Sequence, residues 1–220
     1  MFSLLDSYRD VFRAAVISTL WLNSLALLFG LPLALTLFAL RTSRIATIRF
    51  AAAAVNELLK GLPALVVMFW LFLCLPLVSS WRVSAGTAAI IALALNYAVG
   101  AAEILRSAWQ AVEPDLRNGL GLQGIPRFAG LAFFEAPLLI TSAAPGLLAQ
   151  LATTIKLSAI AAFIGYEEVF HATQGLIQQT YRPVELYTAL AFFYVALVLA
   201  ISGCEAAFRR FRAVPVAPDR

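Results

Sequence analysis

Four ionisable side chains inside or at the ends of long apolar stretches are the residues of this sequence best placed to carry chemistry. They are Glu57, Lys60, Glu103 and Lys156. A charge at bilayer depth costs about 2.5 kcal/mol or more, so it normally pairs with an opposite charge or faces a polar pathway. These positions therefore indicate either a path for a polar solute through a membrane or ion pairs that hold a helix bundle together.

Lys156 has the most apolar surroundings of the four. It lies in the stretch LLAQLATTIKLSAIAAFIG, beside the hydroxyl groups of Thr153, Thr154 and Ser158. A helix there would present hydroxyl groups next to the ammonium group, which suits a polar pathway. Pairing of the lysine with a carboxylate on another helix explains it equally well, so both interpretations stay open.

Glu57 and Lys60 are three residues apart, which is close to one helical turn, and can pair with each other. Gly61 and Pro63 follow directly. We expect the helix to be broken here, as in transporters whose interrupted helices line a cavity. The alternative is a helix that begins at the membrane face with Pro63 in its first turn.

Glu103 is followed by Arg106 at the end of the third apolar stretch. Partial solvation would stabilise two charges at such a position. The alternative to a place on the pathway is an interfacial ion pair worth less than about 1 kcal/mol.

The sequence lacks the motifs of several enzyme classes. Neither of its two lysines follows a glycine, so the chain has no phosphate-binding P-loop and cannot itself be a P-loop ATPase. No GxSxG, HExxH or paired CxxC motif occurs. The single histidine, His171, has Glu167 and Glu168 nearby, but we interpret these residues as a solvated loop cluster rather than a cation site. We expect no catalytic residue, metal or cofactor, and only His171 could act as a general base in the rival case of a membrane enzyme.

The elements that must position these residues are membrane-spanning helices. Of 220 residues, 62% are hydrophobic and 13% are charged, which is too little charge for the surface of a soluble domain. Stretches long enough to cross a bilayer occur at about 14–40, 51–75, 84–105, 146–166 and 186–206. The first is too long for an export signal, so we expect it to be retained. The sequence predicts an all-α membrane protein with five spans in a single domain, residues 1–220.

Basic residues between the spans predict the orientation. With the N-terminus outside and the C-terminus in the cytoplasm, the outer face carries four arginines, namely Arg9, Arg13, Arg82 and Arg182. The inner face then carries ten, at positions 41, 44, 49, 106, 117, 127, 209, 210, 212 and 220. Because basic residues are enriched on the cytoplasmic side, this orientation is favoured and the segment 106–145 is cytoplasmic. Within that segment, residues 128–142 predict a short amphipathic helix on the inner face, with a sixth span as the alternative.

The chain resembles, over residues 14–206, the permease subunits of polar amino-acid importers of the ATP-binding-cassette (ABC) superfamily, the histidine, glutamine and arginine type. The first two matching elements are Glu57-Leu58-Leu59-Lys60-Gly61-Leu62-Pro63 and Glu103-Ile104-Leu105-Arg106 followed by Gln110-Ala111-Val112. The other two are the pair Pro137 and Pro145, and Lys156-Leu157-Ser158 followed by Gly165 and Glu168. The four elements occur in the family's order.

The resemblance implies two sets of functional residues. Polar positions expected to face the substrate pathway are Glu57, Lys60, Glu103, Lys156 and Ser158. Residues expected to form a cytoplasmic coupling helix that docks on an ATPase are Asn118, Gly119 and Leu120, with Gly124 in the following turn. The family has Glu-Ala-Ala where this chain has Asn-Gly-Leu, so the acidic residue of the family's ionic contact with the ATPase is missing here. We expect Arg106, Arg117 and Arg127 to make different contacts instead.

The resemblance also implies partners and a location. We expect two ABC ATPase subunits, which bind the ATP, a periplasmic substrate-binding protein, and a second permease chain. Departures from the family pattern favour a heterodimer over a homodimer. The chain would be a multi-pass protein of the bacterial inner membrane, surrounded by the lipid bilayer and without a nucleic-acid partner. The alternatives are a non-catalytic membrane assembly subunit and a permease for another small polar solute.

Overall fold

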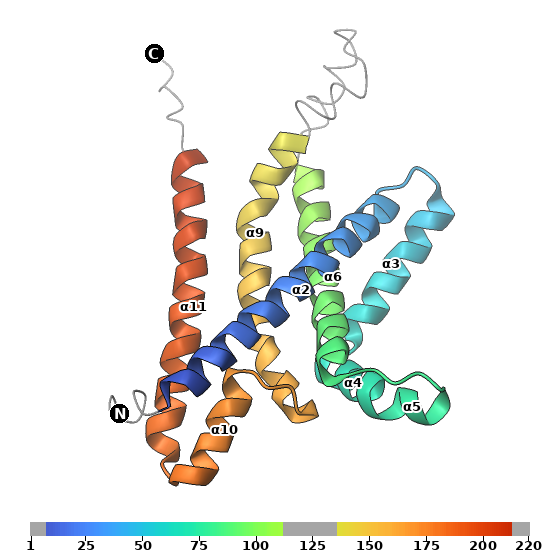
Figure 1. The fold of residues 1–220 in the computed structure, drawn as a ribbon. Coiled ribbons are helices and arrows are strands. Elements are labelled where there is room, and N and C mark those ends of the chain that lie inside the picture. Colours follow the sequence, from blue (N-terminus) through green and yellow to red (C-terminus); the bar gives the residue numbers. More distant parts are fainter. Residues whose placement is uncertain (1–7, 112–135, 213–220) are drawn as a thin grey trace, which may run out of the picture.

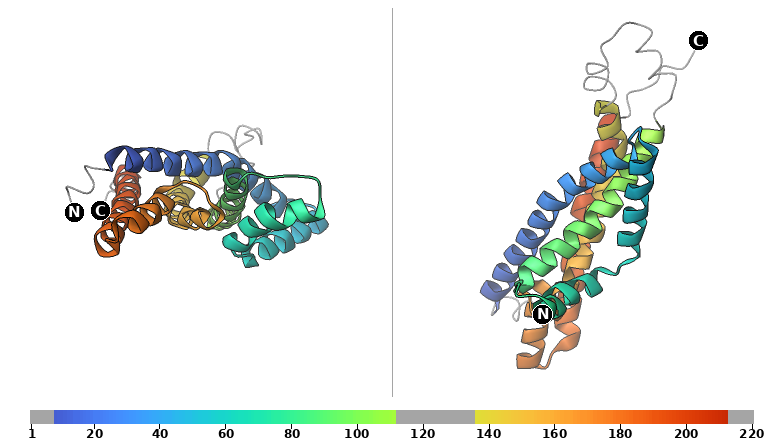
Figure 2. Two further views of the ribbon diagram at one scale, coloured as in Figure 1. Left: turned by 60° about the horizontal axis from the view of Figure 1, so that its bottom comes forward. Right: turned by 90° about the vertical axis from the view of Figure 1, so that its right-hand side faces the viewer.

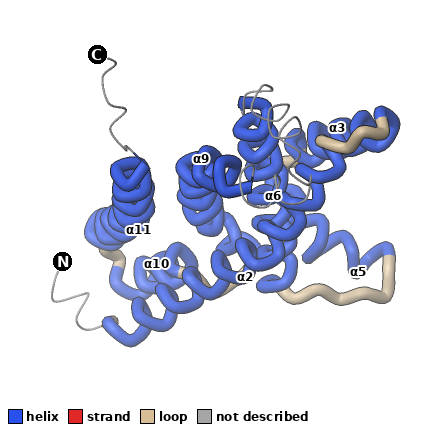
Figure 3. The backbone as a smooth tube through the Cα atoms, turned by 90° about the horizontal axis from the view of Figure 1, so that it is seen from above, coloured by secondary structure: helices blue, strands red, loops and turns tan. Residues whose placement is uncertain are grey.

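The described part of the chain is built from helices and the loops that join them, and it contains no strand (Figures 1 and 3). The computed structural model describes residues 8–111 and 136–212. The long helices are α2 (Arg9–Arg41), α3 (Ala46–Gly61), α6 (Ala85–Ala111), α9 (Ala136–Leu157) and α11 (Pro183–Arg212). The shorter elements are α4 (Ala64–Phe69), a π-helical segment (Trp70–Cys74), α5 (Leu75–Val78), a 3₁₀ segment (Ser158–Ile164) and α10 (Val169–Thr180).

Four of these elements are long and apolar enough to cross a membrane: Arg9–Arg41, Ala85–Ala111, Ala136–Ile164 and Pro183–Phe208. A fifth crossing is present if α3 and the α4–α5 segment count as one broken span. The structure therefore confirms an all-helical protein with four to five candidate spans.

The expected second span, 51–75, is not one straight helix. α3 ends at Gly61, and the chain from Ala64 to Val78 turns away from it by 88°. The cause is Pro63, because a residue that precedes a proline is driven out of the helical region. Leu62 accordingly has an extended backbone with ψ of 119°. The break expected from Gly61 and Pro63 is therefore present, and it turns the chain through about a right angle.

The fourth span begins earlier than expected. Residues 136–142 were expected to belong to a separate helix on the inner face, and this prediction is wrong, because they form the start of α9. Pro145 lies inside α9 rather than ending it. Helices in a bilayer tolerate an internal proline, since neighbouring groups satisfy the backbone it leaves unpaired. The expected loop 106–145 is thus helical at both described ends, through Ala111 and from Ala136.

The helices α11, α9, α6 and α3 follow one another in a row, and α2 crosses this row as a separate layer (Figures 1 and 2). α6 is the most buried of the candidate spans, and α11 is the least buried. Large apolar side chains such as Phe192 and Leu199 are exposed along α11. Such a surface suits a bilayer, in which exposed apolar side chains are solvated.

The closest packing in the fold joins α2 to α6. Ala26 and Ala34 of α2 are fully buried, and so are Ala98 and Ala102 of α6. Small side chains allow two helices to approach closely, which is the main source of helix association in a membrane. Between the two alanines of α2, Gly30 leaves so little space that an added Cβ would lie 3.0 Å from the carbonyl oxygen of Ala94.

Replacement of Gly30 by leucine is expected to destabilise the fold by about 1–3 kcal/mol, because the backbone of α6 must move to admit the side chain. The midpoint of thermal unfolding in detergent measures the effect. Gly203→Leu on α11 is the matched control, since a Cβ at Gly203 meets nothing within 4 Å. Equal midpoints for the two variants would contradict this account of the α2–α6 packing.

Candidate functional site

Lys156 is exposed on α9, and it makes no ion pair with any other described residue. It shares an exposed face of α9 with Thr153, one turn earlier, and Ala149, two turns earlier. The ion pair with a carboxylate on another helix, one of the two interpretations of this lysine, is therefore not formed within the described part of the chain. The ammonium group is available to groups outside the chain.

Ser158 lies two residues further on, yet its side chain is fully buried. The Nδ2 group of Asn23 on α2 donates a hydrogen bond to Ser158 Oγ over 3.0 Å, and Ser158 Oγ donates to the carbonyl oxygen of Ile155 over 2.8 Å. Ser158 is also the residue at which the α-helix tightens into the 3₁₀ segment. Its hydroxyl group thus joins the fourth span to α2, and Lys156 and Ser158 face different surroundings.

Glu57 and Lys60 are both exposed on α3, just before the break at Gly61. Among the described residues they form no ion pair with each other. Both charges therefore lie at the end of an interrupted helix, where the structure leaves them accessible.

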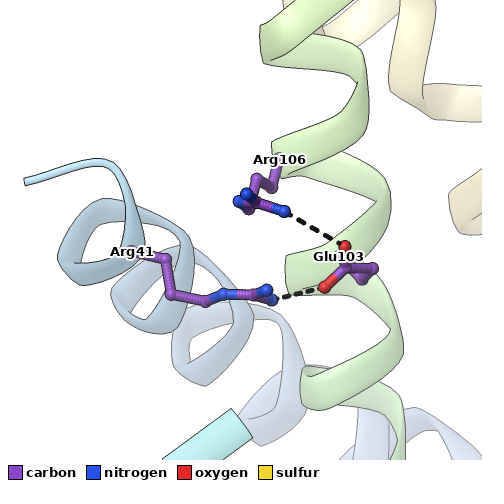
Figure 4. Close-up of polar contacts among 3 residues, drawn as sticks. All are labelled: Arg41, Glu103 and Arg106. Carbon is purple, nitrogen blue, oxygen red and sulfur yellow. Dashed lines mark hydrogen bonds and ion pairs between the residues drawn. The ribbon is translucent and has the colours of Figure 1, made fainter. Parts of the chain in front are cut away.

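Glu103 is the centre of an ion-pair network (Figure 4). Its Oε2 atom lies 2.6 Å from Nη1 of Arg41, and its Oε1 atom lies 3.5 Å from Nη1 of Arg106. The Arg41 side chain is 5% exposed, whereas that of Glu103 is 35% exposed. A buried guanidinium group requires a counter-charge, and Glu103 supplies it. The carboxylate therefore ties the end of α2 to α6.

Arg41 is a member of this ion-pair network that the sequence did not lead us to expect, because it was counted only among the basic residues of the inner face. Two features of the sequence contained the signal. Arg41 follows the first apolar stretch, and Glu103 lies at the end of the third, so the predicted orientation places both on the same side of the membrane. Opposite charges at matching depth are expected to pair.

A second missed residue is Glu168, which was interpreted as part of a solvated loop but is fully buried. It caps the N-terminus of α10 by accepting a hydrogen bond from the backbone N–H of His171 over 2.8 Å. The hydroxyl group of Tyr194 on α11 donates to its other oxygen over 3.2 Å. The solvated-loop interpretation failed because a 3₁₀ segment and a cap, rather than an open loop, surround this carboxyl group.

Gly165 directs the chain into this cap. It ends the 3₁₀ segment with φ of 79°, a left-handed conformation that glycine adopts without strain. After this turn the backbone N–H of Val169 donates to Thr19 Oγ1 of α2 over 3.1 Å. The spacing from Gly165 to Glu168 therefore positions a turn followed by a helix cap.

Burial changes the acidity of Glu168. Removal from water raises the pKa of its carboxyl group above the ordinary value of 4.5, although hydrogen bonds from the backbone of Phe170 and His171 and from Tyr194 oppose the change. The neutral form is thus favoured in the folded protein more than in the unfolded chain.

The residues expected to couple the chain to an ATPase, Asn118, Gly119, Leu120 and Gly124, lie outside the described residues. Among the predicted pathway residues that the structure describes, Glu103 contacts two arginines and Ser158 contacts Asn23. The other three, Glu57, Lys60 and Lys156, are exposed on two different helices. This arrangement provides fixed charges and hydroxyl groups on membrane-spanning helices, which suits the passage of a polar solute.

Comparison with known proteins agrees with this description. A family described as "Binding-protein-dependent transport system inner membrane component" matches residues 26–211. The glutamine transport system permease protein GlnP of Escherichia coli (strain K12) is 28% identical over 186 residues, 84% of each chain. The probable amino-acid ABC transporter permease protein YckA of Bacillus subtilis (strain 168) is 29% identical over 185 residues, 83% of this chain and 81% of that one.

The fold has a counterpart among solved structures. A chain in the crystal structure of an amino acid ABC transporter with histidines superposes with a TM-score of 0.87 at 28% sequence identity. The superposition covers 96% of this chain and 98% of the other.

Removal of the Arg41 charge, as in Arg41→Met, is expected to cost about 1–3 kcal/mol, because it leaves the Glu103 carboxylate without its nearest counter-charge. A second change, Glu103→Gln, should recover part of the loss, and a double-mutant cycle on unfolding midpoints measures the recovery. Arg182→Met removes an exposed pair with a distance of 3.7 Å and should change stability by less than about 1 kcal/mol. Additive effects of the first two changes would contradict the pairing.

The raised pKa of Glu168 predicts a pH dependence of stability. The folded state retains the proton at pH values where the unfolded chain has lost it, so the free energy of unfolding falls as pH rises from about 4.5 through the native pKa. Glu168→Gln preserves the cap without a charge and should lack this fall, whereas Glu168→Ala loses the cap and costs about 1 kcal/mol. Thermal unfolding of both variants, measured across this pH range, distinguishes the loss of the titrating group from the loss of the helix cap. An unchanged slope in Glu168→Gln would refute the assignment.

Proposed function

Because the chain belongs to the family of binding-protein-dependent transport system inner membrane components, we propose that it forms half of a substrate pathway through the bacterial inner membrane. The chain is the permease subunit of an amino-acid ABC importer, as its relatives GlnP and YckA are by name. It is a multi-pass membrane protein and not an enzyme, since ATP hydrolysis belongs to a separate subunit of such importers. We also propose which of its residues serve the pathway.

The observation that carries the proposal is the exposed position of Lys156. It lies well inside the candidate span Ala136–Ile164, on an outward face, and has no counter-charge among the described residues. An unpaired ammonium group facing lipid at that depth would be strongly unfavourable. The face of α9 that carries Lys156 and Thr153 therefore borders a polar space, and a pathway between two permease chains provides one.

The other pathway candidates contribute in different ways. Glu57 and Lys60 stand at the break in the second span, where interrupted helices of transporters present polar groups to a cavity. Glu103 and Ser158 are held by Arg41, Arg106 and Asn23 within the chain, so they would reach a substrate only when these contacts rearrange. A pathway that alternates between two open states supplies such a rearrangement.

The substrate class follows from charge. An amino acid carries an ammonium group and a carboxylate, and the exposed candidates offer both signs, with Lys60 and Lys156 for the carboxylate and Glu57 for the ammonium group. Such a set binds a zwitterion or its charged relatives better than a simple ion. The identity of the amino acid is selected by the substrate-binding protein that delivers it.

The remaining parts of the proposal concern orientation and partners. We place the N-terminus outside and the segment after α6 in the cytoplasm, in agreement with the basic residues. Two ATPase subunits, which bind the ATP, would dock on the coupling helix around Asn118, Gly119, Leu120 and Gly124. A second permease chain, for which a heterodimer is favoured, completes the pathway, and this chain itself needs no cofactor.

Lys156→Met is expected to lower the amino-acid transport rate at least about tenfold, because it removes the charge from the pathway face. The assay uses the tagged chain purified in mild detergent with its partners and reconstituted into liposomes. Mass spectrometry of the same preparation should identify a P-loop ATPase. Lys156→Arg is the matched control and should retain most of the activity, since it retains the charge.

Two outcomes would overturn parts of this proposal. Transport at the normal rate in Lys156→Met would remove Lys156 from the pathway. Recovery of the chain without an ATPase, from gentle conditions and with an intact fold, would refute its role in an ATP-driven importer.

A further inference from the structure

The charge of α9 lies on the side of the helix that faces away from the core. Lys156 follows Leu147 by nine residues, which is about two and a half helical turns, so the two side chains leave α9 on opposite sides. Leu147 packs against the buried cluster that includes Ala34 of α2 and Ala98 of α6. Because α2 covers one side of the row formed by α9, α6 and α3 (Figures 2 and 3), Lys156 points to the other side.

The carboxylate of α3 also points away from the buried cluster. Leu59 packs against the same cluster, and Glu57, two residues earlier, lies about 160° around the helix from it. Lys60 lies close enough to Glu103 of α6 to act electrostatically on its carboxylate. Glu103 in turn pairs with Arg106. We refer to the five ionisable residues of these three helices as the charged face, namely Glu57, Lys60, Glu103, Arg106 and Lys156.

The charged face has an excess of positive charge. Three of its five residues are cations and two are carboxylates. The buried Arg41 adds a further cation behind Glu103, at 2.6 Å from its carboxylate. The described residues of α3, α6 and α9 contain no other aspartate or glutamate. A solute that passes along the charged face therefore meets a net positive charge.

Such an excess selects a solute by the sign of its own net charge. Dielectric screening is weak inside a membrane protein, so charges act over several ångströms without direct contact. A passage lined mainly by one sign of charge concentrates solutes of the opposite sign. An amino acid with a neutral side chain has no net charge, whereas an acidic one is net negative and a basic one is net positive. The charged face therefore favours acidic amino acids and disfavours basic ones.

We propose that this chain carries amino acids whose side chain bears a carboxylate, in preference to amino acids with a cationic side chain. The inference rests on the proposed function, because it takes the charged face as part of the lining of the pathway. It narrows the substrate class by one property, the sign of the net charge. The substrate-binding protein selects the individual amino acid, and the permease adds an electrostatic filter.

The experiment measures the binding of glutamate, glutamine and lysine, which are similar in length and differ in net charge. It uses the complete importer, purified through the tagged chain and placed in lipid nanodiscs, because the second permease chain lines the same pathway. The substrate-binding protein is left out, so the measured selection is that of the permease. We expect glutamate to bind at least about tenfold more tightly than lysine, which corresponds to about 1.4 kcal/mol, with glutamine between them.

Two variants of α3 test the cause in opposite directions. Lys60→Met removes a cation from the charged face and should lower the preference for glutamate over lysine by at least about threefold. Glu57→Gln removes a carboxylate about one turn away and should raise this preference by a similar factor. Damage to α3 does not explain shifts of opposite sign. Arg13→Met is the matched control and should leave the preference unchanged, because Arg13 is an exposed cation of α2 outside the charged face.

Equal binding of glutamate and lysine, or tighter binding of lysine, would overturn the proposal. Shifts of the same sign in Lys60→Met and Glu57→Gln would also overturn it, because they would show that charge is not the cause. These outcomes leave the proposed function intact, since the importer still binds amino acids. Absence of binding for all three amino acids would instead refute the proposed function, and this inference with it.

Discussion

The close contact between α2 and α6 is the interaction on which the other features of the fold depend. Alanines and Gly30 bring the two backbones together, and α2 then crosses the remaining helices as a layer of its own (Figure 2). Three long-range polar contacts described above have one end on α2. Thr19 reaches the start of α10, Asn23 reaches Ser158, and Arg41 reaches Glu103. Displacement of α2 would disturb all three together.

The arrangement separates two kinds of polar residue. Ser158, Glu168 and Arg41 are buried and held by partners in the same chain, and they determine how the spans pack. Lys156, Glu57 and Lys60 are exposed, and none of them forms an ion pair with another described residue. A membrane protein tolerates the second kind only where a partner, water or a solute lies nearby. The bundle in isolation is therefore an incomplete unit whose charged surface requires further components.

Much of this was predictable from the sequence, because its physical causes are local. The scarcity of charge predicts helices in a bilayer, and Gly61 with Pro63 predicts the break in the second span, since proline acts on its immediate neighbours. Pro145 shows the limit of the same rule, because an internal proline in a membrane helix is stabilised by its surroundings. The burial of Glu168 depends on residues far away in the chain, and the pattern around Glu168 itself does not contain that information. The pairing of Arg41 with Glu103 is also long-range, and only the matching depth of the two residues in the predicted topology indicated it.

The contacts of α2 have a consequence for the biosynthesis of the protein. Thr19 and Asn23 enter the membrane first, but their distant partners, Val169 and Ser158, lie 150 and 135 residues later in the chain. Both side chains also donate to a carbonyl oxygen one turn earlier in α2, over 3.0 and 2.8 Å. These local bonds reduce the cost of exposing the side chains to lipid while the ribosome completes the chain. The polar side chains of the first helix therefore have hydrogen-bond acceptors within that helix as soon as it is inserted. Their long-range contacts form only after the fourth span has been inserted.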